Sequence, residues 1–95
     1  MKIGYIRVST EEQRPDRQIE ALRAICDEME VEKLSALSRK RPVYQKVMKK
    51  LEAGDTLVIW EVSRAWRSMK DAVLAGEKLR NRGILLQIGT VVYDL

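Results

Sequence analysis

One serine and several arginines occur at spacings that could bring them into a single site. Ser9 ends the apolar stretch that begins near Lys2, and Arg7 stands two residues before it. Arg64 and Arg67 follow a second, more apolar stretch. Guanidinium groups stay ionised and match phosphate oxygens in a planar, bidentate way. Several of them around one hydroxyl could stabilise a pentacoordinate phosphoryl transition state without a metal while the serine attacks a phosphodiester.

Alternating strands and helices are predicted to position these residues. Short stretches rich in Ile, Val and Tyr alternate with longer segments whose apolar residues recur at helical spacing. We expect strands over residues 2–8, 30–34, 56–62, 84–88 and 91–93, and helices over residues 14–28, from 42 to just before 54, and over 67–82. The stretch 56–62 is the strongest strand, and its continuous apolar character suits a central position covered on both faces.

This order of elements predicts an α/β fold of three layers, α/β/α, with a parallel sheet and right-handed crossovers. Ligands of such sheets bind beyond the carboxyl ends of the strands, where the strand order reverses. If the first and central strands are neighbours, Ser9 meets Arg64 and Arg67 at that point. The two arginines, three residues apart at a helix start, would then share a face, and strand alternation places Arg7 on the side of Ser9. Arg41, on a basic loop nearby, is a candidate fourth guanidinium.

Plainer interpretations remain open for several of these residues. Arg64 and Arg67 could instead form surface ion pairs with Asp71 or Glu61, and the chemistry alone does not decide between the two. On the third helix one side is predicted to carry Met69, Ala72, Val73, Gly76 and Leu79. Met69 and Val73, together with Leu74, are either core residues or a surface for another subunit, and the core is the expectation.

Composition narrows the class of protein. The chain has 95 residues, a formal net charge of +4, one cysteine and no histidine. This excludes an internal disulfide and argues against a zinc site or imidazole chemistry. No apolar run approaches the roughly 20 residues of a membrane span, and the first residues lack a signal-peptide pattern, so we expect a cytoplasmic, single-domain protein. Cys26 lies on the apolar stripe of the first helix and is expected to be a small core residue.

The motifs follow one another in an order that resembles a known family. They are Tyr5-Ile6-Arg7-Val8-Ser9-Thr10, then Gln13, Asp16, Gln18 and Glu20-Ala21-Leu22, then Arg41-Pro42, Gly54-Asp55 and Arg64-x-x-Arg67-Ser68. Together they resemble the N-terminal catalytic domain of the serine recombinases, the resolvase/invertase family. The resemblance covers nearly the whole chain, residues 1–95, in the right order.

The resemblance implies a sheet of strand order 2-1-3-4-5 whose last strand is antiparallel. It also implies site-specific breakage and rejoining of DNA through a covalent 5′-phosphoserine, with no metal or other cofactor, in an active homodimer or tetramer. Ser9 would be the nucleophile, with Arg7, Arg64 and Arg67 holding the scissile phosphate. Supporting roles would fall to Arg41, Gln13, Gln18, Ser63 and Asp55. Asp55 is expected to order the fold or the assembly rather than to take part in the chemistry.

Two departures from the family pattern keep an alternative open. The family's central strand is usually followed by Asp-Arg, whereas this chain has Ser63-Arg64, and a serine cannot act as a carboxylate. The chain also stops at Leu95, so we expect it to lack the long dimerisation helix and the helix-turn-helix DNA-binding domain. The alternative is a catalytically impaired module that binds phosphate or partner subunits. A receiver-like signalling domain would need an acidic cluster where this sequence has arginines.

Overall fold

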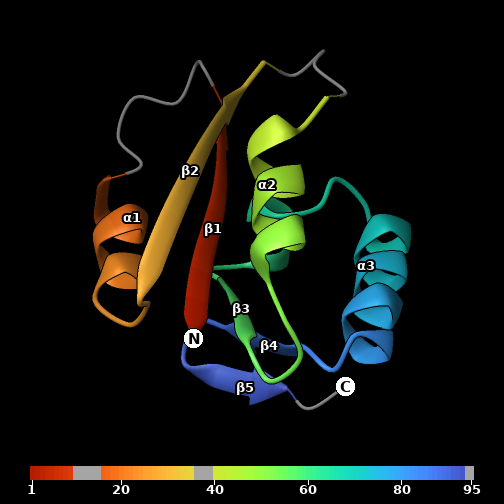
Figure 1. Ribbon diagram of the computed structural model, residues 1–95. Helices are drawn as coiled ribbons and strands as arrows, with labels where there is room; N and C mark the ends of the chain where they lie inside the picture. The colour runs from red at the N-terminus through yellow and green to blue at the C-terminus, as the bar shows by residue number, and fades with distance from the viewer. Residues whose placement is uncertain (10–15, 36–39, 94–95) are drawn as a thin grey trace.

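The computed structural model describes residues 1–9, 16–35 and 40–93 and contains a five-stranded sheet of order β2-β1-β3-β4-β5. The strands are β1 (Lys2–Ser9), β2 (Glu28–Leu34), β3 (Thr56–Ile59), β4 (Leu85–Ile88) and β5 (Val91–Tyr93). The helices are α1 (Asp16–Arg23), α2 (Pro42–Lys50) and α3 (Met69–Asn81), with a 3₁₀ turn, η1 (Val62–Arg64), after β3 (Figure 1). All neighbouring strands are parallel except β4 and β5. The predicted fold class and strand order are therefore confirmed.

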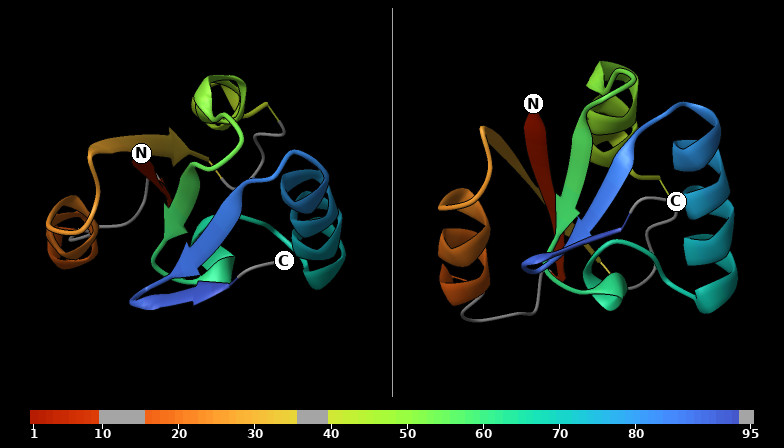
Figure 2. Two further views of the ribbon diagram at one scale, coloured as in Figure 1. Left: turned by 60° about the horizontal axis from the view of Figure 1, so that its bottom comes forward. Right: turned by 90° about the horizontal axis from the view of Figure 1, so that it is seen from below.

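Helices cover both faces of the sheet and form two separate cores. On one face α1 contributes Leu22 to a cluster with Ile6, Val8 and Val58. On the other face α2 and α3 pack against alternate residues of the same strands, including Ile3 and Tyr5 of β1. Figure 2 shows α1 on one side of the sheet and α2 with α3 on the other. Because side chains alternate along β1, Arg7 and Ser9 belong to the face of α2 and α3.

The second helix follows its prediction closely. Pro42 occupies the first turn of α2, where its missing N–H costs nothing and its fixed φ favours the helix. The predicted inward residues Val47 and Leu51 are each 1% exposed, and Val43 and Met48 pack beside them. Their burial fixes α2 over the sheet, and with it the position of Arg41 at the start of the helix.

The first helix is shorter than predicted, and β2 begins earlier. The helix ends at Arg23 and a turn follows. The main chain of Asp27 then donates to the Lys2 carbonyl (2.8 Å), while the Lys2 N–H donates to the Asp27 carboxylate (2.7 Å), which sets the register of β2 on β1. Cys26 and Met29 still pack against the α1-side core. The apolar residues after Arg23 keep helical spacing, but they lie in a turn and a strand that pack on the same core. The helix predicted from periodicity alone was therefore too long.

The third helix exposes residues that were predicted to be core. Met69, Val73 and Leu74 are 73%, 55% and 47% exposed, so the core prediction for them is wrong. The buried positions of α3 are Ala75 and Leu79, with Ala72 packed beside them. The apolar stripe of α3 is thus wider than the strip that contacts the sheet. Within the described ranges, no helix is both long and apolar enough to span a membrane.

Candidate active site

The site end of the sheet is shaped by two parallel strands of unequal length. The pairing of β1 with β3 runs from Lys2 opposite Thr56 to Gly4 opposite Val58, whereas β1 continues beside β2 as far as Ser9. The predicted strand 56–62 is therefore too long, because β3 ends at Ile59. The chain then bends into η1, which contacts β1. This places η1 beside the last residues of β1, where the strand order reverses.

Three of the four predicted catalytic residues line one pocket at this edge. The pocket has a volume of about 210 Å³ and is lined by Arg7, Val8, Ser9, Leu34, Ser35 and Arg64. Arg7 and Ser9 come from β1, and Arg64 is the last residue of η1. Ser9 is exposed, while Arg7 and Arg64 are partly buried. The arrangement places a hydroxyl and two guanidinium groups around a space that is open to a ligand.

Arg7 is held in place by the main chain of the segment that carries Arg64. Its Nη2 atom donates a hydrogen bond to the Ser63 carbonyl oxygen at 3.0 Å. Burial lowers the pKa of Arg7, and the positive charges of Arg41, Arg67 and Arg64 lower it further. An arginine still remains protonated at neutral pH. The mutual repulsion nevertheless means that an anion bound among these groups would relieve it.

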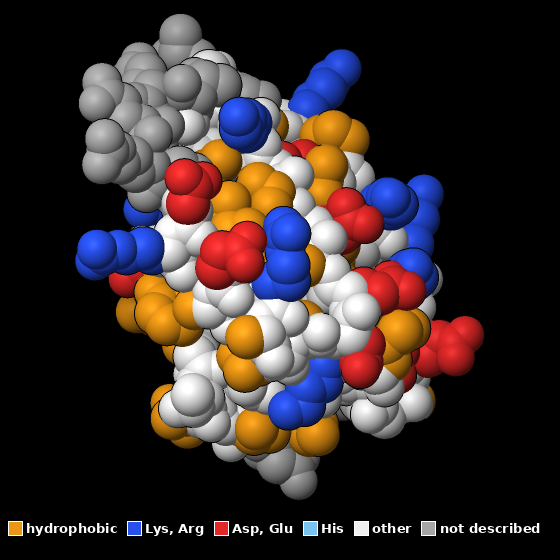
Figure 3. Space-filling model, turned by 90° about the vertical axis from the view of Figure 1, so that its left-hand side faces the viewer, with side chains coloured by type: hydrophobic (Ala, Val, Ile, Leu, Met, Phe, Trp, Pro, Cys, Tyr) orange, Lys and Arg blue, Asp and Glu red, His pale blue; other side chains and the backbone are white. Residues whose placement is uncertain are grey.

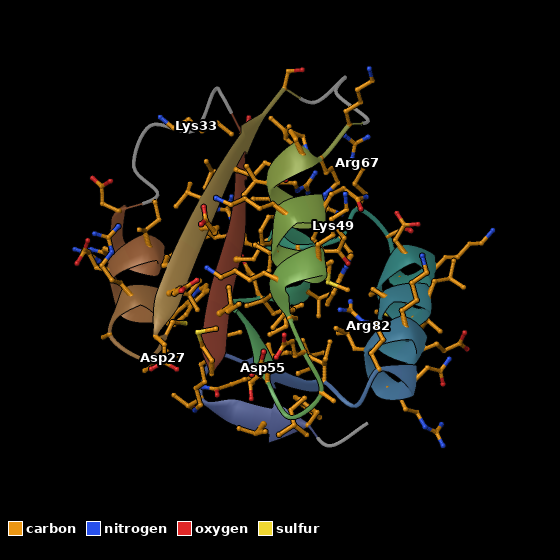
Figure 4. The ribbon with its side chains drawn as sticks, viewed as in Figure 1. Asp27, Lys33, Lys49, Asp55, Arg67 and Arg82 are labelled. Carbon is orange, nitrogen blue, oxygen red and sulfur yellow. The ribbon has the colours of Figure 1, made fainter. Side chains whose placement is uncertain are left out.

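Arg64 and Arg67 do not form the first turn of a helix, as was predicted. Arg64 lies in η1, Arg67 lies in the connection to α3, and α3 begins only at Met69. Ser68 provides the N-cap, since its Oγ accepts the Asp71 N–H at 3.1 Å. Arg67 is exposed and lies toward the same end of the molecule as the pocket, at the far end from Asp55 (Figure 4). Its positive charge helps to lower the pKa of Arg7, but Arg67 does not line the pocket.

Arg64 also forms a surface ion pair with Glu61, which was the alternative prediction for this residue. Its Nε atom lies 3.5 Å from Oε1 of Glu61, three residues earlier. The Glu61 side chain is 51% exposed and that of Arg64 only 24%, so the pair lies at the rim of the pocket. Arg64 therefore both pairs with a surface carboxylate and faces Ser9.

Arg41 occupies a neighbouring groove, not the wall of the Ser9 pocket. This groove lies between α2 and α3, has a volume of about 500 Å³, and is lined in part by Arg41, Tyr44, Trp66 and Lys78. The Nη2 atom of Arg41 donates to the Tyr5 hydroxyl at 3.1 Å and to the Ala65 carbonyl. The guanidinium also lies over the Tyr44 ring, 4.1 Å from its centre. Sequence reasoning placed Arg41 near the site but missed these contacts.

Comparison with known proteins identifies the domain. A family model described as "Resolvase, N terminal domain" matches residues 2–94. This chain belongs to the resolvase family of serine recombinases. It is 45% identical over 85 residues to serine recombinase gin of Escherichia phage Mu, which covers 88% of this chain and 44% of the relative. It is also 45% identical over 85 residues to a DNA-invertase of Escherichia phage P1, which covers 88% of this chain and 46% of the relative.

A third relative, DNA-invertase hin of Salmonella typhimurium, is 42% identical over 82 residues, which are 85% of this chain and 43% of the relative. The resolvase domain thus spans less than half the length of the relatives it matches.

Among the supporting residues, Asp55 has a clear structural role in this resolvase domain. It lies just before β3, far from the pocket (Figure 4). Its Oδ1 accepts the Met1 amine at 3.0 Å and its Oδ2 accepts the Glu52 N–H at 2.9 Å. The hydrogen bond from Glu52 and then that from the amine hold the pKa of Asp55 below its ordinary value. Asp55 thus fastens the start of β1 to the turn before β3.

The other supporting residues have different positions. Ser63 is exposed, and its carbonyl, not its hydroxyl, holds Arg7. Gln18 lies on α1, across the sheet from Arg7, and its buried Oε1 has no hydrogen-bond partner among the described residues. Gln13 lies outside the described residues. The roles of Ser63, Gln13 and Gln18 stay predictions.

The side of the molecule that carries α1 has a surface of mixed charge (Figure 3). On the side of the molecule that carries α1, acidic and basic side chains are intermixed (Figure 3). The described residues on that side form no single broad basic patch. At the site end, by contrast, the positive charges of Arg41, Arg67 and Arg64 lie near enough to Arg7 to lower its pKa.

Proposed function

We propose that this resolvase domain is the catalytic part of a site-specific DNA recombinase, with Ser9 as its nucleophile. The observation that carries the proposal is the convergence of Arg7, Ser9 and Arg64 on one pocket where the strand order reverses. The named activities of the relatives, recombinase and DNA-invertase, support the same reaction class. Arg67 and Arg41 would add positive charge from the rim and from the neighbouring groove.

The reaction is an exchange of phosphodiester bonds that needs no net energy input. The Ser9 Oγ forms a bond to phosphorus as the bond from phosphorus to the 3′ oxygen breaks. The proton of the serine leaves and the 3′ oxygen gains a proton, which gives a 5′-phosphoserine and a free 3′-hydroxyl. Attack by a 3′-hydroxyl of the recombined strand reverses these steps and restores Ser9. Arg7 and Arg64 would stabilise the charge that builds on the non-bridging oxygens in both directions.

DNA and further copies of the protein are the partners that this proposal requires. Two duplexes must be held together while their strands exchange, so the active form would be a homodimer or tetramer. The exposed apolar side chains of α3, Met69, Val73 and Leu74, offer one surface that association could bury. Light scattering over a concentration series tests this for the domain alone.

A second candidate function is phosphate binding without strand exchange. Ser63 stands where the family usually has an aspartate, and a hydroxyl cannot carry out proton transfer as a carboxylate does. Arg7 is bonded to the Ser63 carbonyl, which any residue at this position would supply, so this contact does not require an aspartate. The pocket would then bind a phosphodiester that it does not cleave.

A covalent trapping experiment separates the two functions. The domain would be joined to the dimerisation helix and DNA-binding domain of a related recombinase and incubated with a suicide substrate carrying that relative's site. The proposal predicts a covalent protein–DNA adduct that is absent in Ser9→Ala. Arg64→Gln should slow adduct formation by about 10²- to 10³-fold, as expected when one transition-state donor is lost.

The matched control is Arg23→Gln, which removes an exposed guanidinium from α1 on the opposite face of the sheet and should leave the rate unchanged. An adduct that persists in Ser9→Ala would refute the role of Ser9. Absence of an adduct in the parent chain, with its appearance in Ser63→Asp, would refute cleavage by the parent chain and favour the second function.

A further inference from the structure

A buried carboxylate lies in the middle of β2, beneath the start of α2. Glu32 is only 2% exposed. Its Oε2 accepts the Val43 N–H at 2.8 Å, and its Oε1 accepts the Tyr44 N–H at 3.1 Å and the Tyr5 hydroxyl at 2.7 Å. Burying a carboxylate costs several kcal/mol unless its oxygens are satisfied. The first N–H groups of α2 and the positive end of its dipole meet this requirement.

The carboxylate also fixes the direction of the hydrogen bond from Tyr5. The Tyr5 hydroxyl has a single hydrogen, and it donates that hydrogen to the Glu32 Oε1. The lone pairs of the Tyr5 oxygen are then left to accept from Arg41, whose Nη2 lies 3.1 Å away. Burial, followed by the hydrogen bond to Glu32, raises the pKa of Tyr5, so the phenol keeps this hydrogen at neutral pH. The order Glu32, Tyr5, Arg41 is therefore a directed chain of hydrogen bonds.

Arg41 is held on several sides at once. Besides Tyr5, its Nη2 donates to the Ala65 carbonyl, in the segment between Arg64 and Arg67. The guanidinium lies over the ring of Tyr44 and 5.5 Å from the ring centre of Tyr5. Such contacts between a cation and aromatic faces stabilise a desolvated guanidinium. The cation therefore has a fixed place, near enough to Arg7 to lower its pKa.

We propose that Glu32 and Tyr5 are positioning residues that fix Arg41 beside the Ser9 pocket. They act by two routes. Glu32 accepts the main-chain N–H groups of Val43 and Tyr44, which fastens the start of α2, and Tyr5 fastens the Arg41 guanidinium itself. This inference rests on the proposed function, because it assigns the position of Arg41 a part in strand cleavage. Neither residue touches the pocket wall.

The test compares Tyr5→Phe with Thr56→Val in the joined chain used for covalent trapping. Both changes remove a buried hydroxyl, and Thr56 lies at the opposite end of the sheet, so it controls for lost stability. We expect adduct formation at saturating DNA to be about tenfold slower in Tyr5→Phe and unchanged in Thr56→Val. In an Arg41→Gln background, Tyr5→Phe should cause no further loss. A tenfold loss that persists in that background would show that Tyr5 acts only on stability, and would overturn the proposal.

A second measurement does not depend on DNA cleavage. The side-chain Nε–Hε resonance of Arg41 is followed by NMR in the 95-residue chain. Tyr5→Phe and Glu32→Gln should shift this resonance, whereas Thr56→Val should not. If Glu32→Gln fails to fold, Tyr5→Phe carries the comparison. An unmoved resonance overturns the positioning role even where adducts form. Absence of adducts in every chain overturns the proposed function, and the NMR result then decides the positioning claim by itself.

Discussion

Adding a methyl group to Gly4 should destabilise the domain, and removing one sulfur atom should cancel the effect. A Cβ at Gly4 would lie 2.7 Å from the Cys26 Sγ and 2.8 Å from the Met29 Sδ, both far inside van der Waals contact. The Met29 sulfur belongs to a flexible side chain and can move, but Cys26 has a short one. Overpacking of this kind costs about 1–3 kcal/mol. We therefore expect Gly4→Ala to lower the free energy of unfolding by that amount.

In a Cys26→Ala background the nearest remaining atom at that residue is the Cβ, 3.5 Å from the added methyl, which is ordinary contact. Gly4 does not have a positive φ, so alanine is tolerated there and gains about 0.4–1 kcal/mol from the unfolded state. Gly4→Ala should then be neutral or slightly stabilising. Urea unfolding followed by tryptophan fluorescence measures all four corners of this cycle.

The control for the Gly4 cycle is Gly76→Ala on α3, where nothing lies within 4 Å of the added methyl and a gain of about 0.5–1 kcal/mol is expected. An equal loss from Gly4→Ala in both backgrounds would refute the reasoning, because the cost would then not come from the sulfur of Cys26. The outcome bears on the site because Gly4 lies in β1, the strand that carries Arg7 and Ser9, and allows Cys26 and Met29 to pack closely against that strand.

Three further outcomes are expected. Asp55 has a lowered pKa when folded, so its stabilising contribution is present above its unfolded pKa near about 3.9 and is lost as the pH falls through the folded value. The free energy of unfolding of the parent chain should therefore approach that of Asp55→Asn in acid, as urea titrations from pH 7 to pH 2 would show. Burial raises the pKa of the Cys26 thiol to about 11, so a thiol reagent at pH 8 should label it far more slowly in the folded chain than in urea. Glu61→Gln removes a carboxylate that pairs with Arg64, so NMR titration should show tighter inorganic phosphate binding at low salt and no difference at about 1 M salt, where the Debye length is about 3 Å. Glu20→Gln, which breaks an equivalent pair with Arg23 on α1, should leave phosphate binding unchanged, and an equal effect of both changes would point to net charge alone.

The topology of the sheet could be predicted from the sequence because its signals are local. Strands and helices alternate, Pro42 starts a helix, and the apolar run that begins at Thr56 belongs in the centre of a sheet. The ends of elements were less predictable because burial, not helicity, sets the apolar pattern. Cys26 and Met29 face the core from a turn and a strand, while Met69 and Val73 sit at helical spacing and face outward.

The site could be predicted as far as strand ends determine it. Ser9 and Arg64 meet because Ser9 ends β1 and Arg64 follows β3, beside the point where the strand order reverses, and that follows from topology. The position of Arg41 depends instead on Glu32, which reads in the sequence as an ordinary acidic residue within a weak strand. Two of its three hydrogen bonds come from the start of α2 and the third from Tyr5 of β1, so they arise only when α2, β1 and β2 are placed together. The donors that bond to this buried carboxylate are distant from it in the sequence, so residue spacing does not predict them.

One face of β1 explains why chemistry is available at this end of the domain and not at the other. Along that face Tyr5 is fully buried, Arg7 is partly buried and Ser9 is exposed. The gradient exists because β3 leaves the sheet at Ile59 while β1 continues beside β2. Tyr5 can thus bind the Arg41 guanidinium from within the core. Arg7 keeps its charge in a partly buried position, and Ser9 is accessible to a ligand from solvent. A longer β3 would occupy the place of η1 and remove Arg64 from the pocket, so the early end of this short central strand is what creates the site.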